Sequence, residues 1–247
     1  MKEQYVYDYE RLEKEHWWWL ARRRILRSSL KRVHRGVTYP QKPSLLDLGC
    51  GAGVNLSALR DDFDCVGMEP NRTLSIRARA NAKVPIYQGS LPYGIPDLGQ
   101  AFDYILLLDV LEHIEDDLAA LKAAASLLTK NGKIIINVPA MHCLWSVHDE
   151  INLHKRRYSA GQLKRLVHRS GLRLRSLRHW GSFLVPLVYV ERHIMAAQST
   201  KERYRVKIPP RMPNRILEEL VIAEFAWLGA ISIPFGLSML AIMQHMS

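Results

Sequence analysis

Short apolar runs alternate with helical spacing along the middle of the chain, and this alternation predicts the fold. Apolar runs predict strands at 44–48, 65–68, 85–87, 104–108 and 133–138. Between them, helical spacing predicts helices at 54–60, 71–82 and 116–129. Strands that alternate with helices indicate right-handed βαβ units, a parallel sheet and helices on both of its faces. We expect a doubly wound α/β fold whose ligand lies at the carboxyl ends of the strands.

Both ends of the chain depart from this rhythm. Residues 8–34 carry apolar and aromatic positions at helical spacing, which predicts one long helix that ends at Gly36. Further on we predict helices at 159–170, 183–197 and 214–228 and strands at 172–180 and 237–244. The predicted organisation is a helical cap at 1–43, a core at 44–180, a helical insertion at 181–235 and a closing strand at 236–247.

An uncharged stretch near the C-terminus runs from Phe225 to Met243 and approaches the length that spans a bilayer. Pro234 and Gly236 interrupt it, so we predict a helix, a turn and a strand rather than an anchor. A broken spanning helix remains the alternative. The charged N-terminus lacks the apolar segment of a secretion signal, and three cysteines cannot form a disulfide framework, so we expect a cytoplasmic protein.

Basic residues exceed acidic ones, with a formal net charge of +11 and a pI near 9.7. Their distribution is uneven, because no acidic residue occurs between Glu15 and Asp47 or between Glu150 and Glu191. Two basic segments around a more acidic middle indicate an anionic partner: a phosphorylated substrate, a lipid surface or nucleic acid. A solvated basic surface explains the same charge pattern equally well.

The clearest chemical motif is a glycine turn, Gly49-Cys50-Gly51-Ala52-Gly53, which follows an apolar strand and opens a helix. Glycines let a ligand lie against bare backbone, and the helix N-terminus offers free N–H groups. The spacing G-x-G-x-G departs from the dinucleotide motif G-x-G-x-x-G. Glu69 ends the second strand, where a carboxylate can accept hydrogen bonds from a ribose diol.

At these motifs, and over about residues 44–140, the chain resembles the class I S-adenosylmethionine-dependent methyltransferases. The resemblance implies a Rossmann-like sheet of seven strands, with the last two antiparallel at one edge, and S-adenosylmethionine as cofactor. It places Asp47 near the amino group of the cofactor, the three glycines Gly49, Gly51 and Gly53 under its methionine and ribose portions, and Glu69 at the ribose. Ser90 stands in the loop that edges the adenine, where the family commonly has Asp, and Asp109 ends the fourth strand.

The flanks resemble a narrower group within that class. The segment EHWWWLARRRIL resembles its leading segment, which implies a helical lid over the cofactor with contributions from Trp18 and with Arg22 reaching the cofactor carboxylate. The segment HDEINLHKRRYS resembles the stretch that follows the fifth strand, and PFGLSMLAIMQ resembles the closing strand.

Three histidines are candidates for catalysis. Methyl transfer is an in-line displacement, and an oxygen or nitrogen acceptor can need a base, for which His is the usual choice. His113 follows the fourth strand, and His148 and His154 lie in a polar, aromatic loop at 142–158. A helix cap at His113 and a structural loop are the alternatives. We expect no metal, because His142, Cys143, His148 and Asp149 lack compact ligand spacing.

These features predict methyl transfer to a small or lipid-linked acceptor. Arg173, Arg175 and Arg178 are candidates to meet an acceptor phosphate, and the insertion at 181–235 is expected beside the acceptor. A methyltransferase for RNA or protein is one alternative, favoured by the basic charge. A non-catalytic, cofactor-binding scaffold that contacts an anionic membrane peripherally through residues 181–247 is the other.

Overall fold

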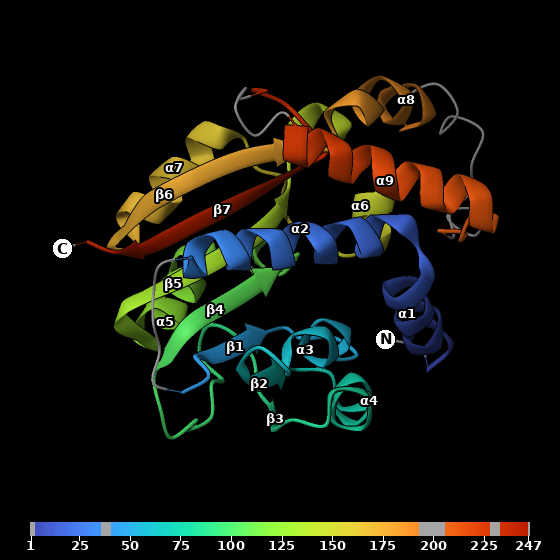
Figure 1. Cartoon of the computed structure of the whole chain (residues 1–247). Helices are drawn as coiled ribbons and strands as arrows, with labels where there is room; N and C mark the ends of the chain where they lie inside the picture. Colours follow the sequence, from blue (N-terminus) through green and yellow to red (C-terminus); the bar gives the residue numbers. More distant parts are fainter. Residues whose placement is uncertain (1–2, 36–40, 193–205, 228–232, 247) are drawn as a thin grey trace.

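Seven strands form one mixed sheet with helices on both faces (Figure 1). The computed structural model describes residues 3–35, 41–192, 206–227 and 233–246. The strands are β1 (Ser44–Leu48), β2 (Asp64–Glu69), β3 (Ile86–Gln88), β4 (Phe102–Leu108), β5 (Leu128–Pro139), β6 (Leu172–Trp180) and β7 (Ser238–His245). Their order in the sheet is β3-β2-β1-β4-β5-β7-β6, with β1 to β5 parallel and β7 antiparallel to both neighbours. The predicted doubly wound sheet and its antiparallel edge are confirmed.

The helices are α1 (Glu3–Glu15), α2 (Trp17–His34), α3 (Val54–Leu59), α4 (Arg72–Ala82), α5 (Asp117–Ser126), α6 (Val147–Ile151), α7 (Ala160–Arg169), α8 (Val185–Val190) and α9 (Arg211–Trp227). Short 3₁₀ turns occur at η1 (Leu111–His113), η2 (His142–Leu144) and η3 (Ser182–Leu184). Helices α5 and α7 cover one face of the sheet, and α2, α3, α4 and α9 cover the other.

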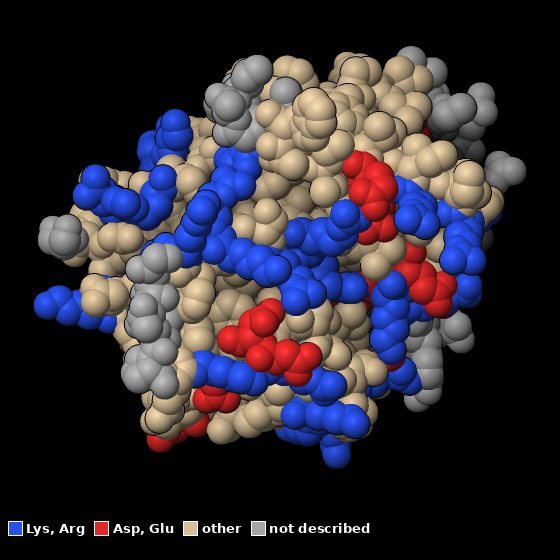
Figure 2. All heavy atoms as spheres, in the orientation of Figure 1, with Lys and Arg blue, Asp and Glu red and all other residues tan. Residues whose placement is uncertain are grey.

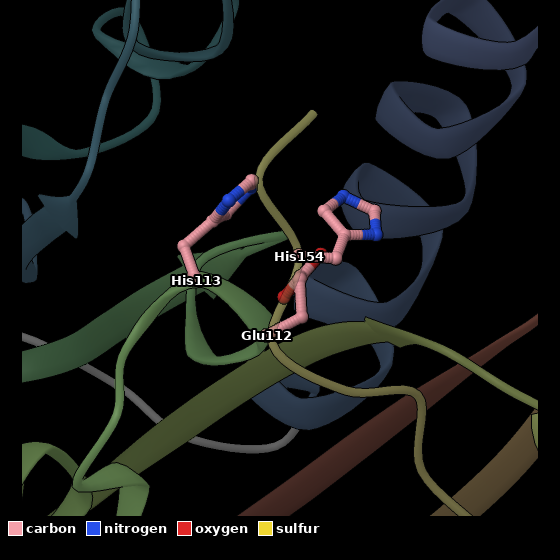
Figure 3. Close-up of side chains that lie close together, drawn as sticks. All are labelled: Glu112, His113 and His154. Atoms are coloured by element: carbon pink, nitrogen blue, oxygen red, sulfur yellow. The ribbon is translucent and has the colours of Figure 1, made fainter. Parts of the chain in front are cut away.

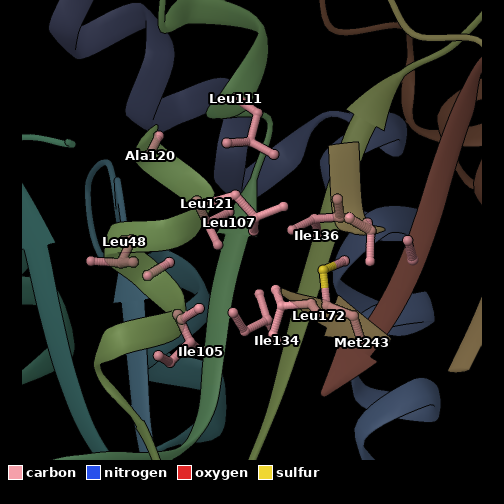
Figure 4. Close-up of a cluster of buried hydrophobic side chains, with 14 of the residues drawn as sticks. Leu48, Ile105, Leu107, Leu111, Ala120, Leu121, Ile134, Ile136, Leu172 and Met243 are labelled. Carbon is pink, nitrogen blue, oxygen red and sulfur yellow. The ribbon is translucent and has the colours of Figure 1, made fainter. Parts of the chain in front are cut away.

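The central strand β4 explains why the sheet is buried on both faces. Its side chains alternate, so that Ile105 and Leu107 face α5 while Tyr104 and Leu106 join the core under α2. Figure 4 shows the first of these cores, with Leu121 of α5 beside the side chains of β4. The two cores hold the carboxyl ends of β1, β2 and β4 at one edge of the sheet, where the site lies.

The N-terminal cap consists of two helices rather than the single predicted helix. His16 has extended backbone dihedrals, and its Nδ1 accepts a hydrogen bond from the N–H of Trp18, which makes it the N-cap of α2. Because the extended backbone of His16 interrupts the helix, α1 ends at Glu15 and α2 begins in a different direction (Figure 1). Gly36, the predicted end of the helix, lies outside the described residues.

Strand β5 begins at Leu128, five residues earlier than predicted, and α5 ends correspondingly at Ser126. Leu128 is buried and pairs with Phe102 before the register shifts, so Asn131 and Gly132 lie inside the strand rather than in a turn. A Cβ at Gly132 would lie 2.9 Å from the carbonyl oxygen of Phe102, which explains the glycine in this irregular pairing. An Asn-Gly pair favours a turn, but burial of Leu128 before it keeps Asn131 and Gly132 within the strand.

The segment between β6 and β7 packs against the N-terminal cap. Arg24 of α2 pairs with Glu218 and Glu219 of α9, and the N–H of Trp17 donates to Oδ1 of Asn214. Of the helix predicted at 183–197, η3 and α8 are observed, and residues 193–197 lie outside the described part. None of the helices within the described ranges combines the length and the apolar character needed to cross a membrane.

Candidate active site

The glycine turn between β1 and α3 forms the floor of the site. Gly49, Gly51 and Gly53 all have positive φ, at 78°, 57° and 76°. A Cβ at Gly53 would lie 2.9 Å from Cα of Ala78 in α4, so the close approach of these two segments requires glycine. The N–H groups of Gly49 and Cys50 donate to the carbonyl oxygen of Met68, and that of Gly53 donates to the carbonyl oxygen of Cys50.

Glu69 folds back onto this turn from the end of β2. Its Oε2 accepts a hydrogen bond of 2.9 Å from the N–H of Gly51, and its Oε1 accepts one of 2.9 Å from the N–H of Asn71. Burial raises the pKa of Glu69 to about 7, although both hydrogen bonds favour the ionised form. The carboxylate is thus held rigidly at the strand end where the ribose contact is predicted.

Helix α1 lies over the same turn and adds residues that the sequence analysis did not select. Oε2 of Glu13 accepts a hydrogen bond of 3.2 Å from the N–H of Ala52, and Tyr9 and Glu13 both approach Gly51. Nothing in the local pattern separates Glu13 from its exposed neighbours, because its burial arises from the contact between α1 and a turn far along the chain. The cap is therefore part of the site.

Three carboxyl groups are buried together beneath the cap. Burial raises the pKa of Glu13, Asp47 and Glu69 to about 7 each. Oδ2 of Asp47 has no hydrogen-bond partner among the described residues. A cationic ligand group would offset the cost of burying these charges. The pocket floor is accordingly suited to a positively charged ligand that also carries hydroxyl groups.

Arg22 and Asp109 join the cap to the end of β4. The guanidinium of Arg22 is almost fully buried and pairs with Oδ2 of Asp109. Nδ2 of Asn137 donates to Oδ1 of Asp109 at 2.6 Å, and Nε1 of Trp180 donates to Oδ1 of Asn137 at 2.9 Å. Trp18 stacks on Trp180 with ring centroids 4.2 Å apart. Arg22 and Trp18 therefore hold α2 on the sheet, and their predicted cofactor contacts remain predictions.

The structure brings two of the three predicted histidines together. The rings of His113 and His154 meet edge to face with centroids 4.8 Å apart, beside the buried Glu112 (Figure 3). Burial and the neighbouring His154 lower the pKa of His113, so its imidazole is neutral at pH 7. His148 lies instead on α6 against Asn152, and burial lowers its pKa to about 4.

The other predicted residues lie farther from this centre. Ser90 is exposed and pairs with Gly94 in a turn after β3. Arg173 and Arg175 lie toward the amino ends of the parallel strands, because β6 runs parallel to β5 and these residues are near its start. Arg178 packs on Phe225 with its guanidinium 3.8 Å from the ring centroid. That these arginines meet a phosphate of the acceptor remains a prediction.

The basic residues form a band on the face covered by α2. Figure 2 shows Lys and Arg gathered across this face. A hollow of about 340 Å³ lies within it, and its basic lining consists of Arg32, Lys133, Arg175 and Arg178. The hollow thus lies at the antiparallel edge of the sheet, against β6 and β7.

A model of the methyltransferase domain matches residues 10–177, which cover the cap, the glycine turn and the histidine loop. The chain belongs to the methyltransferase domain family. The identification as a class I S-adenosylmethionine-dependent methyltransferase is thereby confirmed, with S-adenosylmethionine as cofactor. The buried carboxyls fit this cofactor, whose ammonium and sulfonium groups are positively charged and whose ribose carries a diol.

Curated relatives include ubiquinone biosynthesis O-methyltransferases from Azorhizobium caulinodans and Methylobacterium nodulans. The chain is 32% identical to the first over 99 residues, which cover 38% of this chain and 39% of the relative. It is 32% identical to the second over 94 residues, which cover 36% and 38%. The matches thus span about two fifths of the length of these relatives.

Solved structures share the fold over nearly the whole chain. One belongs to the complex between the Haloferax volcanii Trm112 methyltransferase activator and a methyltransferase, with a TM-score of 0.59, 16% identity and coverage of 99% and 96% of the two chains. Another is an S-adenosylmethionine-dependent methyltransferase from Thermotoga maritima, with a TM-score of 0.55, 18% identity and coverage of 99% and 97%. At these identities the likeness establishes the fold.

Replacing Glu69 with Ala should weaken S-adenosylmethionine binding by about 1.5–3 kcal/mol, the range for lost hydrogen bonds to a charged group. Isothermal titration calorimetry measures the effect. Asp64→Ala is the matched control, because Asp64 is an exposed acid at the other end of the same strand. Equal affinities of the two variants would remove Glu69 from the ribose role.

Proposed function

We propose that the chain transfers a methyl group from S-adenosylmethionine to a hydroxyl of a small acceptor that carries an apolar tail. The cofactor supplies the activated methyl group. The chain's own residues hold the acceptor oxygen in line with it and exclude water. His113 lies in η1 after β4, and His154 lies beside it in the segment after α6. The pair acts on the acceptor hydroxyl, and a neutral imidazole can take its proton.

The position of α8 is the observation that supports an acceptor with an apolar tail. This helix has no buried residues, and Leu187, Tyr189 and Val190 are exposed along it. Nη1 of Arg192, just after α8, donates to Oδ2 of Asp149 at 3.3 Å. Oδ1 of Asp149 in turn lies 2.9 Å from Nδ1 of His154. The exposed apolar helix α8 is therefore held beside the histidine pair, where it would cover an apolar tail of the acceptor.

The relatives support the same acceptor class. Their names describe O-methylation in ubiquinone biosynthesis. Ubiquinone precursors combine a hydroxylated aromatic ring with an apolar chain. The exposed apolar side chains of α8, tethered beside the His113–His154 pair, support such a two-part acceptor.

The test compares a catechol with and without a short prenyl tail as acceptors of labelled methyl groups. We expect transfer to both, with a lower KM for the tailed compound. Leu187→Ser should raise the KM of the tailed acceptor about threefold to tenfold, through roughly 1 kcal/mol of lost apolar contact, and leave that of the untailed one unchanged. Met212→Ser on α9 is the matched control, since Met212 is also exposed.

No transfer to either catechol would contradict the proposal. Transfer to total RNA or to protein in the same assay would establish the alternative acceptor class. If the wild-type enzyme has equal KM values for the two catechols, methyl transfer to a hydroxyl stands, but α8 does not bind the apolar tail.

The histidine pair provides a separate prediction. His113→Ala and His154→Ala should each slow methyl transfer about 100-fold while S-adenosylmethionine affinity stays within twofold. His142→Ala is the control, because His142 is exposed and its ring contacts Gln162 rather than the histidine pair. Parental rates in both variants, measured by single-turnover kinetics, would make the pair structural.

A further inference from the structure

We infer that Glu112, His113 and His154 form a binding site for a divalent transition-metal ion. One potential ligand atom from each residue lies within 4.8 Å of the others (Figure 3). Glu112 and His113 are adjacent in η1, at the end of β4, and His154 comes from the segment after α6. The N–H of Lys155 donates to the carbonyl oxygen of Glu112 at 2.6 Å, which fixes His154 against η1.

Glu112 is the observation that points to a ligand. Its side chain is fully buried, and neither carboxylate oxygen has a hydrogen-bond partner in the described part of the chain. Buried carboxylates are normally paired, hydrogen-bonded or bound to a metal, because an isolated buried charge is strongly unfavourable. One of these oxygens lies within 4.8 Å of a ring nitrogen of each histidine, and a cation bound between them would offset the buried charge.

His154 is oriented as metal ligands are. Its Nδ1 lies 2.9 Å from Oδ1 of Asp149, which is itself fixed by Arg157 and by the N–H of Ser146. Asp149 also pairs with Arg157 and Arg192, and a carboxylate in these pairs only accepts hydrogen bonds. Nδ1 of His154 therefore carries the proton, and Nε2 is the nitrogen that faces a metal.

The donor set selects the class of ion. Two imidazole nitrogens and one carboxylate suit Zn²⁺, Fe²⁺ or Mn²⁺, whereas Mg²⁺ and Ca²⁺ favour sites built of oxygen ligands. Three protein ligands leave coordination positions open, and the site adjoins Asp109 at the strand end. Binding of the acceptor hydroxyl at an open position would depend on the proposed function, whereas the metal site itself is independent of that function.

The sequence predicts no metal, because His154 lies 41 residues after His113 and the three residues form no compact ligand motif. The ligands inferred here are brought together by the sheet: η1 follows β4, and the segment of His154 follows β5 and α6. An imidazole nitrogen that binds the ion cannot also take the acceptor proton. In the metal-bound enzyme, therefore, the ion would replace direct proton transfer to that nitrogen.

The test is titration of the chelator-treated, full-length protein with ZnCl₂ by isothermal calorimetry, with MgCl₂ in parallel. We expect one Zn²⁺ per chain with micromolar or tighter affinity, and binding of Mg²⁺ at least 100-fold weaker. Glu112→Gln and His154→Ala should each weaken Zn²⁺ binding at least 100-fold. His113→Ala serves as a third variant, and circular dichroism checks that all three variants are folded.

Surface binding is controlled with the double variant His142→Ala, Cys143→Ser, which removes an exposed His-Cys pair elsewhere on the loop. Loss of Zn²⁺ binding in this variant, or wild-type affinity in all three ligand variants, would overturn the inference. Absorption of the Co²⁺-substituted protein gives a second readout, with d–d bands that Glu112→Gln should shift. The titration contains no acceptor, so absence of Zn²⁺ binding would contradict the metal site without bearing on the proposed methyl transfer.

Discussion

Replacing Asp109 with Asn is expected to lower the free energy of unfolding by about 3 kcal/mol, near the lower end of the range for breaking a buried ion pair. The change leaves the buried guanidinium of Arg22 without its counter-charge. Asn is the appropriate substitution because Asp109 has a φ of 59°, and Asn tolerates this left-handed backbone. Urea unfolding of the cofactor-free protein measures the loss.

The matched control is Glu15→Gln, which breaks the pair of Glu15 with Arg11. Those side chains are 52% and 69% exposed, so their pair contributes at most a few tenths of a kcal/mol. Equal losses in the two variants would show that Arg22 and Asp109 do not anchor the cap. Hydrogen exchange in α2 should also rise in Asp109→Asn and stay unchanged in the control.

Replacing Asp47 with Asn is expected to remove much of the decline in stability of the cofactor-free protein at rising pH. Burial raises the pKa of Asp47 to about 7, against about 3.9 for an unfolded chain. Between these values the folded state keeps a proton that the unfolded state releases. The free energy of unfolding therefore falls from about pH 4 to about pH 7, by up to about 4 kcal/mol from this group.

Urea unfolding at pH 5 and pH 8 tests this, with Asp61→Asn as the control because Asp61 is exposed. The control should keep the wild-type difference between the two pH values. Asp47→Asn should reduce it, and the remainder reflects Glu13 and Glu69, whose pKa values burial also raises. An unchanged difference in Asp47→Asn would mean that Asp47 is ionised in the folded protein at pH 5.

Local sequence determined the framework of the sheet and the floor of the site. The apolar run at 104–108 predicted a strand, and β4 is that strand. Helical spacing predicted a helix at 71–82, and Asn71 caps it, because its Oδ1 accepts from the N–H of Leu74. The glycine turn followed from residues adjacent in the chain. In each case the determining interactions lie within a few residues, so the pattern contains the required information.

Tertiary structure alone decided which distant groups meet. Glu13 lies over Ala52, Arg22 reaches Asp109, and Glu112 meets His154, and each contact joins segments that different layers of the fold bring together. No local pattern marks such a residue, because its burial and its partner depend on the packing of the cap and the loops over the strand ends. The sequence by itself determined that this chain has a cofactor floor at the carboxyl ends of its strands. Long-range packing decided that α1 covers this floor and that the carboxylate of Glu112 lies beside His113 and His154. The physical reason is burial, because these groups lose contact with water only when the cap and the loops pack over the strand ends.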